Sequence, residues 1–146
     1  MIAIDAMPRE FTSKSVEETE HIAADLAATL RGGECVALDG ELGAGKTQFV
    51  RGLLKGLGGD PKSVSSPTFV LLNVYDSGRL TLFHLDAYRV HGGQDFEAIG
   101  FNELIEQAGL VVVEWASRVR DLLPEDRIAI SIEHIDDHTR RIVIDR

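Results

Sequence analysis

The chain has 146 residues, of which 44% are apolar, and this length and composition suit one globular domain with a single core. Fifteen basic and twenty-four acidic residues give a net charge of −9, which disfavours stable, direct binding to RNA or DNA. No apolar run approaches the roughly 20 residues that cross a bilayer, so we expect a cytoplasmic protein without membrane association whose residues 1–146 form one domain.

The first predicted helix begins at a capping-box pattern, Ser15-Val-Glu-Glu18. In this pattern the two end side chains can each bond a free backbone N–H group of the first turn. Ile22, Leu26 and Leu30 then recur on one stripe, as in a helix that covers one side of a sheet. Gly32-Gly33 predicts the end of this helix.

An apolar run and a glycine-rich loop follow. Cys35–Asp39 is typical of a buried parallel strand, and Gly40-Glu-Leu-Gly-Ala-Gly-Lys-Thr47 matches the phosphate-binding pattern G-x-x-x-x-G-K-[ST] at every specified position. The apolar residues after the loop recur at helical spacing: Phe49, Val50, Leu53, Leu54 and Leu57, before Gly58-Gly59 and Pro61. The alternative, a glycine-rich turn with an incidental lysine, is disfavoured because strand, loop and helix stand in the required order.

The residue types of the loop suit the phosphates of a nucleotide. Its glycines let backbone N–H groups surround phosphate oxygens, and the following helix contributes the positive end of its dipole. Lys46 can reach the β and γ phosphates, and the Thr47 hydroxyl can ligate Mg²⁺. We predict binding of ATP and ADP, because the sequence contains no Asn-Lys-x-Asp guanine signature. The predicted nucleotide contacts in the loop are Glu41, Leu42, Gly43, Ala44, Gly45, Lys46 and Thr47.

Two further strands are predicted at Phe69–Tyr75 and Leu80–Asp86, joined as a hairpin across Asp76-Ser-Gly78. Ser66-Pro67-Thr68 precedes them. Hydroxyls at this place after the loop helix can respond to a γ-phosphate as switch segments do, although the composition alone favours an ordinary turn that enters a strand.

The second half of the chain continues the alternation of helices and strands. Its predicted elements are a helical region at Phe96–Ala108, a buried strand at Leu110–Val113, a helix at Trp115–Leu123, and a hairpin of Arg127–Ile132 and Arg141–Ile144 across Asp136-Asp137. The order of elements predicts an α/β fold of the P-loop NTPase type. Its central parallel sheet is flanked by antiparallel strands, with helices on both faces.

Two apolar segments end in a carboxylate, at Asp86 and Glu114. Ligands of parallel α/β sheets gather at the carboxyl ends of strands, so either residue could serve Mg²⁺ beside Thr47. Glu114 follows the more continuous apolar run and is the preferred metal partner; the alternative is a strand-end acid in solvent. If the bound nucleotide is hydrolysed, Asp86 is a candidate for orienting or deprotonating the water that attacks the γ-phosphate. Together with Lys46, these two acids form the predicted catalytic set.

Nearby polar and aromatic side chains have simpler interpretations. His84 suits a packed or hydrogen-bonded strand residue better than a catalyst, Arg89 can brace Asp86, and Trp115 suits packing better than stacking on a base.

Taken together, these segments resemble the TsaE (YjeE) family, small ATPases of bacterial tRNA threonylcarbamoyladenosine biosynthesis. The resemblance rests on motifs spread over most of the chain: Ser15–Thr19, Gly40–Thr47, Ser66–Phe69, His84–Arg89, and Val113–Ala116 before Leu123-Pro124. It implies a single P-loop ATPase domain that hydrolyses ATP to ADP and phosphate. The implied partner is the TsaB–TsaD complex, in which TsaD transfers the threonylcarbamoyl group to adenosine 37 of tRNA.

The resemblance also implies roles for particular residues. Thr47 and Glu114 would bind Mg²⁺, Asp86 would belong to the catalytic site, and Thr19 would lie near the nucleotide. Arg140, in the final hairpin turn, is a further candidate for nucleotide contact. Gln48 departs from the family pattern, since many relatives have a second Thr or Ser there, but Thr47 remains as the metal ligand.

The implied mechanism is in-line attack of water on the γ-phosphate. No arginine can be assigned as a finger from the sequence, so we expect slow hydrolysis without the partner complex, which would also hold the tRNA. Two alternatives stay open. A small-molecule kinase would need an acceptor pocket and a lid, for which the chain offers little length, and a nucleotide-sensing module would bind ATP without significant hydrolysis.

Overall fold

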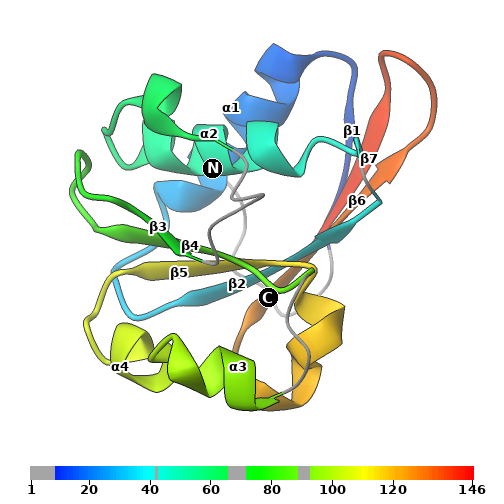
Figure 1. Ribbon diagram of the computed structural model, residues 1–146. Helices are drawn as coiled ribbons and strands as arrows, with labels where there is room; N and C mark the ends of the chain where they lie inside the picture. The colour runs from blue at the N-terminus through cyan, green and yellow to red at the C-terminus, as the bar shows by residue number, and fades with distance from the viewer. Residues whose placement is uncertain (1–8, 42, 66–71, 89–92) are drawn as a thin grey trace.

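A seven-stranded mixed sheet with helices on both faces forms the fold (Figure 1). The computed structural model describes residues 9–41, 43–65, 72–88 and 93–146. The strands are β1 (Arg9–Ser13), β2 (Cys35–Gly40), β3 (Leu72–Tyr75), β4 (Leu82–Asp86), β5 (Leu110–Glu114), β6 (Ile128–His134) and β7 (Arg140–Asp145). The helices are α1 (Val16–Ala27), α2 (Lys46–Gly56), α3 (Gly93–Ala98) and α4 (Phe101–Ile105), with 3₁₀ helices η1 (Pro61–Ser63) and η2 (Ala116–Leu122).

The strand order is β1-β7-β6-β2-β5-β4-β3. The four central strands, β6, β2, β5 and β4, pair in parallel, whereas β7 and β3 pair antiparallel to their neighbours and β1 pairs antiparallel to β7. This arrangement confirms the predicted fold class. Because β2 lies between β5 and β6, the loop that follows it emerges at the middle of the sheet.

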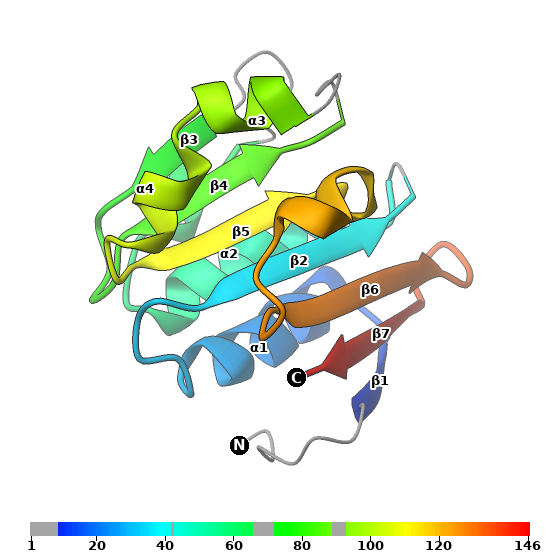
Figure 2. The ribbon, with the colours of Figure 1, turned by 90° about the horizontal axis from the view of Figure 1, so that it is seen from below.

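The helices form two layers (Figure 2). Viewed from below, α3, α4 and η2 lie in front of the sheet, and α1 and α2 lie behind it. Every residue of β5 is buried, and neighbours along β2 alternate between the layers: Val36 and Leu38 join the core under α1 and α2, whereas Cys35 and Ala37 join the opposite core. Burial on both faces explains why these strands are apolar until their carboxyl ends, at Asp39 and Glu114. No helix within the described ranges is long and apolar enough to span a membrane.

Both predicted hairpins are present in the described residues, as β3 with β4 and β6 with β7. The helical region predicted around Phe96–Ala108 consists of two short helices, α3 and α4, which Gly100, at φ 83°, separates. The helix predicted at Trp115–Leu123 is instead the 3₁₀ helix η2, which Val119 interrupts at φ −129° and ψ 25°. In both segments, the backbone conformation of one residue, Gly100 or Val119, interrupts the helix.

Strand β1 was not predicted. Its sequence, Arg-Glu-Phe-Thr-Ser, contains only one large apolar residue, Phe11, and it lies at the edge of the sheet beside β7. In an edge strand with few apolar residues, apolar and polar residues hardly alternate, so the sequence does not indicate a strand. This pairing matters for the site, because it leads the chain directly into Ser15 and α1, next to the final hairpin.

Helices α1 and α2 cross at very short range through glycines of α2. A Cβ added to Gly52 would lie 2.6 Å from Glu20 Cα and 2.7 Å from Ala23 Cβ, and one added to Gly56 would lie 2.7 Å from Ala24 Cα. The small residues therefore set how closely the loop helix packs on α1.

We expect Gly52→Ala to destabilise the chain by about 1–3 kcal/mol, because the new methyl group overlaps α1 backbone. Helix propensity alone predicts the opposite sign, a gain of about 0.5–1 kcal/mol. Urea unfolding of the ligand-free chain measures the difference. Lys55→Ala, at an exposed position of the same helix, is the control and should change stability little. A stabilised Gly52→Ala variant would show that α1 and α2 can move apart without a loss of folding stability.

Candidate functional site

The loop between β2 and α2 has the backbone conformation that its glycines permit. Gly43 and Gly45 have φ values of 81° and 108°, in the left-handed region. Gly45 is the N-cap of α2 and provides no side-chain hydrogen bond, so the first N–H groups of α2 are left for a ligand. A Cβ at Gly40 would lie 2.8 Å from the carbonyl oxygen of Ile132, so the start of the loop also requires glycine. The sequence pattern therefore produces an anion-binding helix end.

Lys46 folds back across this loop. Its ammonium group donates hydrogen bonds to the carbonyl oxygens of Gly40 and Glu41, the latter at 3.1 Å. It also lies 4.2 Å from the centre of the Trp115 ring, within range of a cation–π interaction. Burial lowers the pKa of Lys46, whereas the negative charges of Glu114 and Asp86 act in the opposite direction. The lysine is thus held at the loop by backbone oxygens and one aromatic face.

The two predicted acids lie side by side. In the parallel pair of β4 and β5, Asp86 is in register with Glu114, so both carboxylates stand at the carboxyl ends of neighbouring strands. Glu114 is 4% exposed and is hydrogen-bonded through Oε2 to His84 Nε2. Asp86 is half-buried, and its Oδ1 accepts the backbone N–H of Tyr88 at 2.8 Å. The structure brings together Lys46, Asp86 and Glu114 as the sequence predicts.

Burial raises the pKa of Asp86, and the charge of Glu114 raises it further, while the hydrogen bond from Tyr88 opposes the shift. A carboxyl group whose pKa is raised on folding stabilises the folded chain at low pH. The chain loses this contribution as pH rises from the unfolded pKa of the group through its folded pKa. The ionised Asp86 therefore destabilises the ligand-free chain at neutral pH. Perturbed pKa values of this kind cluster at functional sites.

We predict that Asp86→Asn raises the unfolding temperature of the ligand-free chain at pH 7, because it removes one of two crowded charges and keeps an acceptor for Tyr88. The gain should shrink as pH falls toward about 4 and vanish well below it, where the acid is protonated in both states. Thermal unfolding across this pH range checks the prediction. Asp121→Asn, at an exposed position of η2, is the control. A gain that is independent of pH would assign the effect to something other than ionisation.

The donor set fits Mg²⁺. Thr47 is the second residue of α2 and offers a hydroxyl, and Glu114 and Asp86 offer carboxylate oxygens, the ligands that this hard cation prefers. Within the described ranges, no group of three or more His, Cys, Asp and Glu side chains is arranged to hold a metal. Magnesium at phosphate-binding sites needs only one or two protein ligands, since water and phosphate oxygens supply the others.

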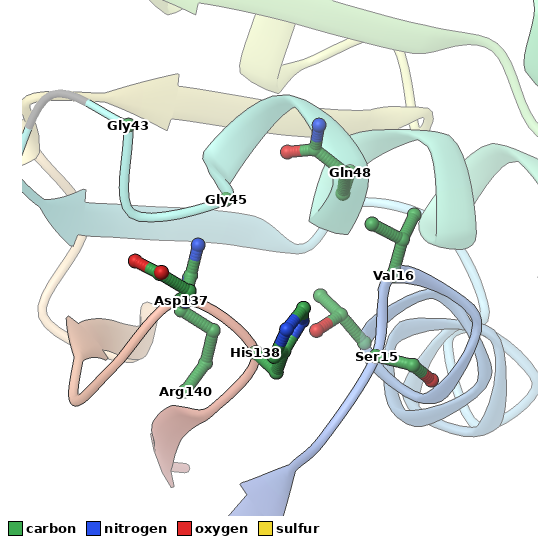
Figure 3. Close-up of a pocket in the computed structure, with 9 residues that line it drawn as sticks. Ser15, Val16, Gly43, Gly45, Gln48, Asp137, His138 and Arg140 are labelled. Carbon is green, nitrogen blue, oxygen red and sulfur yellow. The ribbon is translucent and has the colours of Figure 1, made fainter.

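A pocket of about 160 Å³ adjoins the loop (Figure 3). Its walls come from three segments that are distant in sequence, namely the start of α1, the loop with α2, and the final hairpin. The lining residues are Ser15, Val16, Thr19, Gly43, Gly45, Gln48, Asp137, His138 and Arg140. Since Gly43 and Gly45 belong to both, the pocket continues from the phosphate-binding loop.

Thr19 and Arg140 both line this pocket. The resemblance implies that Thr19 lies near the nucleotide, and Arg140 is a further candidate for nucleotide contact. Thr19 is buried, and its hydroxyl shares a hydrogen bond of 2.7 Å with Ser13. Arg140 Nε donates to the Ala44 carbonyl oxygen at 3.0 Å, and its Nη1 donates to the Asp136 carbonyl oxygen at 2.7 Å. Arg140 therefore ties the hairpin to the loop, a bracing contact that the sequence did not indicate.

Several pocket residues were missed by the sequence analysis, among them Val16, Asp137 and His138. Val16 lies near the final hairpin because β1 pairs with β7, and β1 was itself not predicted. Asp137 and His138 follow β6, which pairs with β2. His84 and Trp115 agree with their predicted packing: His84 is hydrogen-bonded within the core, and Trp115 packs 4.9 Å from the Tyr88 ring. The predictions for Leu42, Ser66–Thr68 and Arg89 concern positions outside the described residues.

A phosphate-binding loop between a central strand and a buried helix, with acids at the ends of β4 and β5, defines an α/β protein of the P-loop NTPase type. The sequence model of the family described as threonylcarbamoyl adenosine biosynthesis protein TsaE matches residues 13–142. The chain therefore belongs to the TsaE family.

Individual relatives agree with this assignment. The tRNA threonylcarbamoyladenosine biosynthesis protein TsaE of Treponema pallidum is 42% identical over 90% of this chain and 96% of its own length. The TsaE protein of Aquifex aeolicus is 40% identical over 94% of this chain and 96% of its own length. The crystal structure of Bacillus subtilis YdiB is similar with a TM-score of 0.78 and 32% identity, covering 97% of this chain and 87% of YdiB.

Proposed function

We propose that this chain is a Mg²⁺-dependent ATPase that converts ATP to ADP and phosphate in support of tRNA threonylcarbamoyladenosine formation by the TsaB–TsaD complex. One observation carries the proposal: the loop lysine and two strand-end carboxylates converge at an uncapped helix N-terminus. The biosynthetic role is supported by the names of the relatives, which are tRNA threonylcarbamoyladenosine biosynthesis proteins.

The residues of the site have separable roles in this reaction. The N–H groups at the start of α2 and the Lys46 ammonium bind the β and γ phosphates and neutralise charge that develops during transfer. Asp86 orients the attacking water, and its raised pKa suits an acceptor of the water proton. Thr47 and Glu114 would hold Mg²⁺, which when bound neutralises phosphate charge.

Hydrolysis by the chain alone is expected to be slow. Arg140, which lines the pocket, directs its guanidinium to backbone carbonyl oxygens of the loop and the hairpin. An arginine finger at the γ-phosphate can increase turnover by roughly 10³–10⁵-fold, so a group from the partner complex is proposed to complete the site. The net charge of −9 also favours tRNA binding by that complex instead of by this chain.

A nucleotide-sensing role is the second candidate, and one set of contacts favours it. Lys46 lies over Trp115, Trp115 packs on Tyr88, and Tyr88 is 47% exposed. Phosphates that draw Lys46 away from the ring would therefore be sensed at the protein surface. If Glu114→Ala and Asp86→Ala keep partner-stimulated function while Lys46→Ala abolishes it, sensing explains the function better than hydrolysis.

Phosphate release from Mg²⁺·ATP by the purified chain, with and without TsaB–TsaD, tests the ATPase proposal. We expect a low basal rate that the complex increases. Equal rates in both reactions would contradict the role of the partner. Stoichiometric phosphorylation of an added metabolite, without phosphate release, would instead favour the kinase.

A further inference from the structure

A buried histidine contacts the acid that would hold the metal. His84 lies on β4 in register with Val112 of β5, two residues before the Asp86–Glu114 pair. Side chains two residues apart on a strand share a face, so His84 and Asp86 point to the same side of the sheet. The His84 side chain is fully buried, and its Nε2 is hydrogen-bonded to Glu114 Oε2. This contact thus links a buried side chain of the sheet to Glu114 in the candidate site.

The second ring nitrogen shows which way this hydrogen bond runs. His84 Nδ1 is buried and has no hydrogen-bond partner within the described part of the chain. A proton on Nδ1 would bury an N–H group without an acceptor, so a proton on Nε2 fits the surroundings of the ring better. We assign the proton to Nε2 on this ground. His84 is then the donor, and Glu114 accepts through Oε2.

Packing alone does not explain a histidine at this position. Leu82 and Leu85 fill neighbouring core positions of β4 with apolar side chains, and a buried nitrogen without a partner costs roughly 1–3 kcal/mol relative to such residues. The donor instead serves Glu114, whose carboxylate is hydrogen-bonded to Nε2. Glu114 is also near enough to Lys46 and Asp86 for its charge to act on both.

We propose that His84 is a positioning residue for Glu114. Its Nε2–H fixes one carboxylate oxygen, Oε2, which restrains the side-chain rotamer and leaves Oε1 for Mg²⁺ or for a water molecule bound to it. Hydrogen bonds from outside the coordination sphere commonly orient metal ligands in this way, and their loss typically weakens metal binding by about 10–100-fold. The inference rests on the proposed function, since it gives His84 a role only where Glu114 serves the metal.

Two substitutions and one control separate positioning from packing. His84→Leu removes the donor and keeps an apolar core residue, whereas His84→Gln keeps an amide N–H near the place of Nε2. Phe83→Leu changes the adjacent buried residue, which packs in the opposite core layer and so controls for damage to β4. Thermal unfolding without ligand shows whether each variant folds.

The measurement is the affinity for ADP in EDTA and across a Mg²⁺ titration. For His84→Leu we expect a half-maximal Mg²⁺ concentration raised by about 10–100-fold, with the affinity in EDTA within about twofold of wild type. His84→Gln should recover most of the loss, and Phe83→Leu should resemble wild type. An unchanged Mg²⁺ requirement in His84→Leu, or equal losses in His84→Leu and His84→Gln, would overturn the proposal.

The wild-type chain offers a second measurement that needs no substitution. In ¹⁵N-histidine spectra of the ADP-bound chain, the Nε2–H signal of His84 should shift on addition of Mg²⁺, because its acceptor becomes a metal ligand. If Mg²⁺ increases the affinity for ADP but the signal does not move, the positioning role is contradicted and the metal site is not. If Mg²⁺ leaves the wild-type affinity for ADP unchanged, the proposed metal site and the positioning role fail together, while nucleotide binding by the loop still stands.

Discussion

Replacement of Lys46 by alanine should lower kcat for ATP hydrolysis by about 10²–10³-fold, the usual effect of removing one preorganised donor from a developing charge. The ammonium group is buried at the loop and held by the Gly40 and Glu41 carbonyl oxygens, so solvent offers no equivalent substitute. Phosphate release under saturating ATP, in the presence of TsaB–TsaD, is the measurement.

The matched control is Lys55→Ala, which removes the same side chain from an exposed position near the end of α2. Its kcat should stay within about twofold of wild type, because the charge lies at the far end of the helix from the loop. A Lys46→Ala chain that is folded and retains wild-type turnover would show that hydrolysis occurs elsewhere or does not depend on this loop.

Glu114→Gln is expected to give the second large effect. The substitution keeps the shape of the side chain and an oxygen that can accept from His84, but it removes the buried negative charge. Turnover should fall by about 10²-fold, in line with the loss of one electrostatic contact to the transition state, and more Mg²⁺ should be needed for half-maximal rate. Phosphate release across a Mg²⁺ titration measures both changes.

Binding of ADP in EDTA distinguishes this effect from general damage. Without metal, Glu114→Gln should bind ADP at least as well as wild type, since a negative charge near the phosphates has been removed. The control is Glu106→Gln, an exposed acid after α4. An unchanged Mg²⁺ requirement in Glu114→Gln would remove this residue from the metal site.

The phosphate-binding loop and the central strands were predictable because their signals are local. Gly43 and Gly45 need conformations that glycine permits, and most residues of β2 and β5 are apolar because both faces are covered. Asp86 and Glu114 could be expected at the same sheet edge from their positions at strand ends. Their direct registration is a property of the paired strands β4 and β5, and the structure was needed to show it.

The features that escaped prediction depend on long-range contacts. The β1–β7 pairing brings Ser15 and Val16 to the hairpin of His138, more than 120 residues later in the chain. Likewise, the hydrogen bond of His84 to Glu114 depends on the register of strands that are separated by α3 and α4. Periodicity describes which face a residue occupies but gives no information on its partner across a sheet.

We expect ATP turnover at this loop to support tRNA modification. The most direct measurement follows phosphate release and threonylcarbamoyladenosine at tRNA position 37 together, in a reaction that contains TsaB–TsaD, tRNA, a threonylcarbamoyl donor and Mg²⁺·ATP. With the wild-type chain, both products should accumulate over many turnovers, and both should fall when Lys46→Ala replaces it or the chain is omitted. Equal modified-nucleoside yields over many turnovers with the wild-type chain, with Lys46→Ala and without the chain would contradict the account.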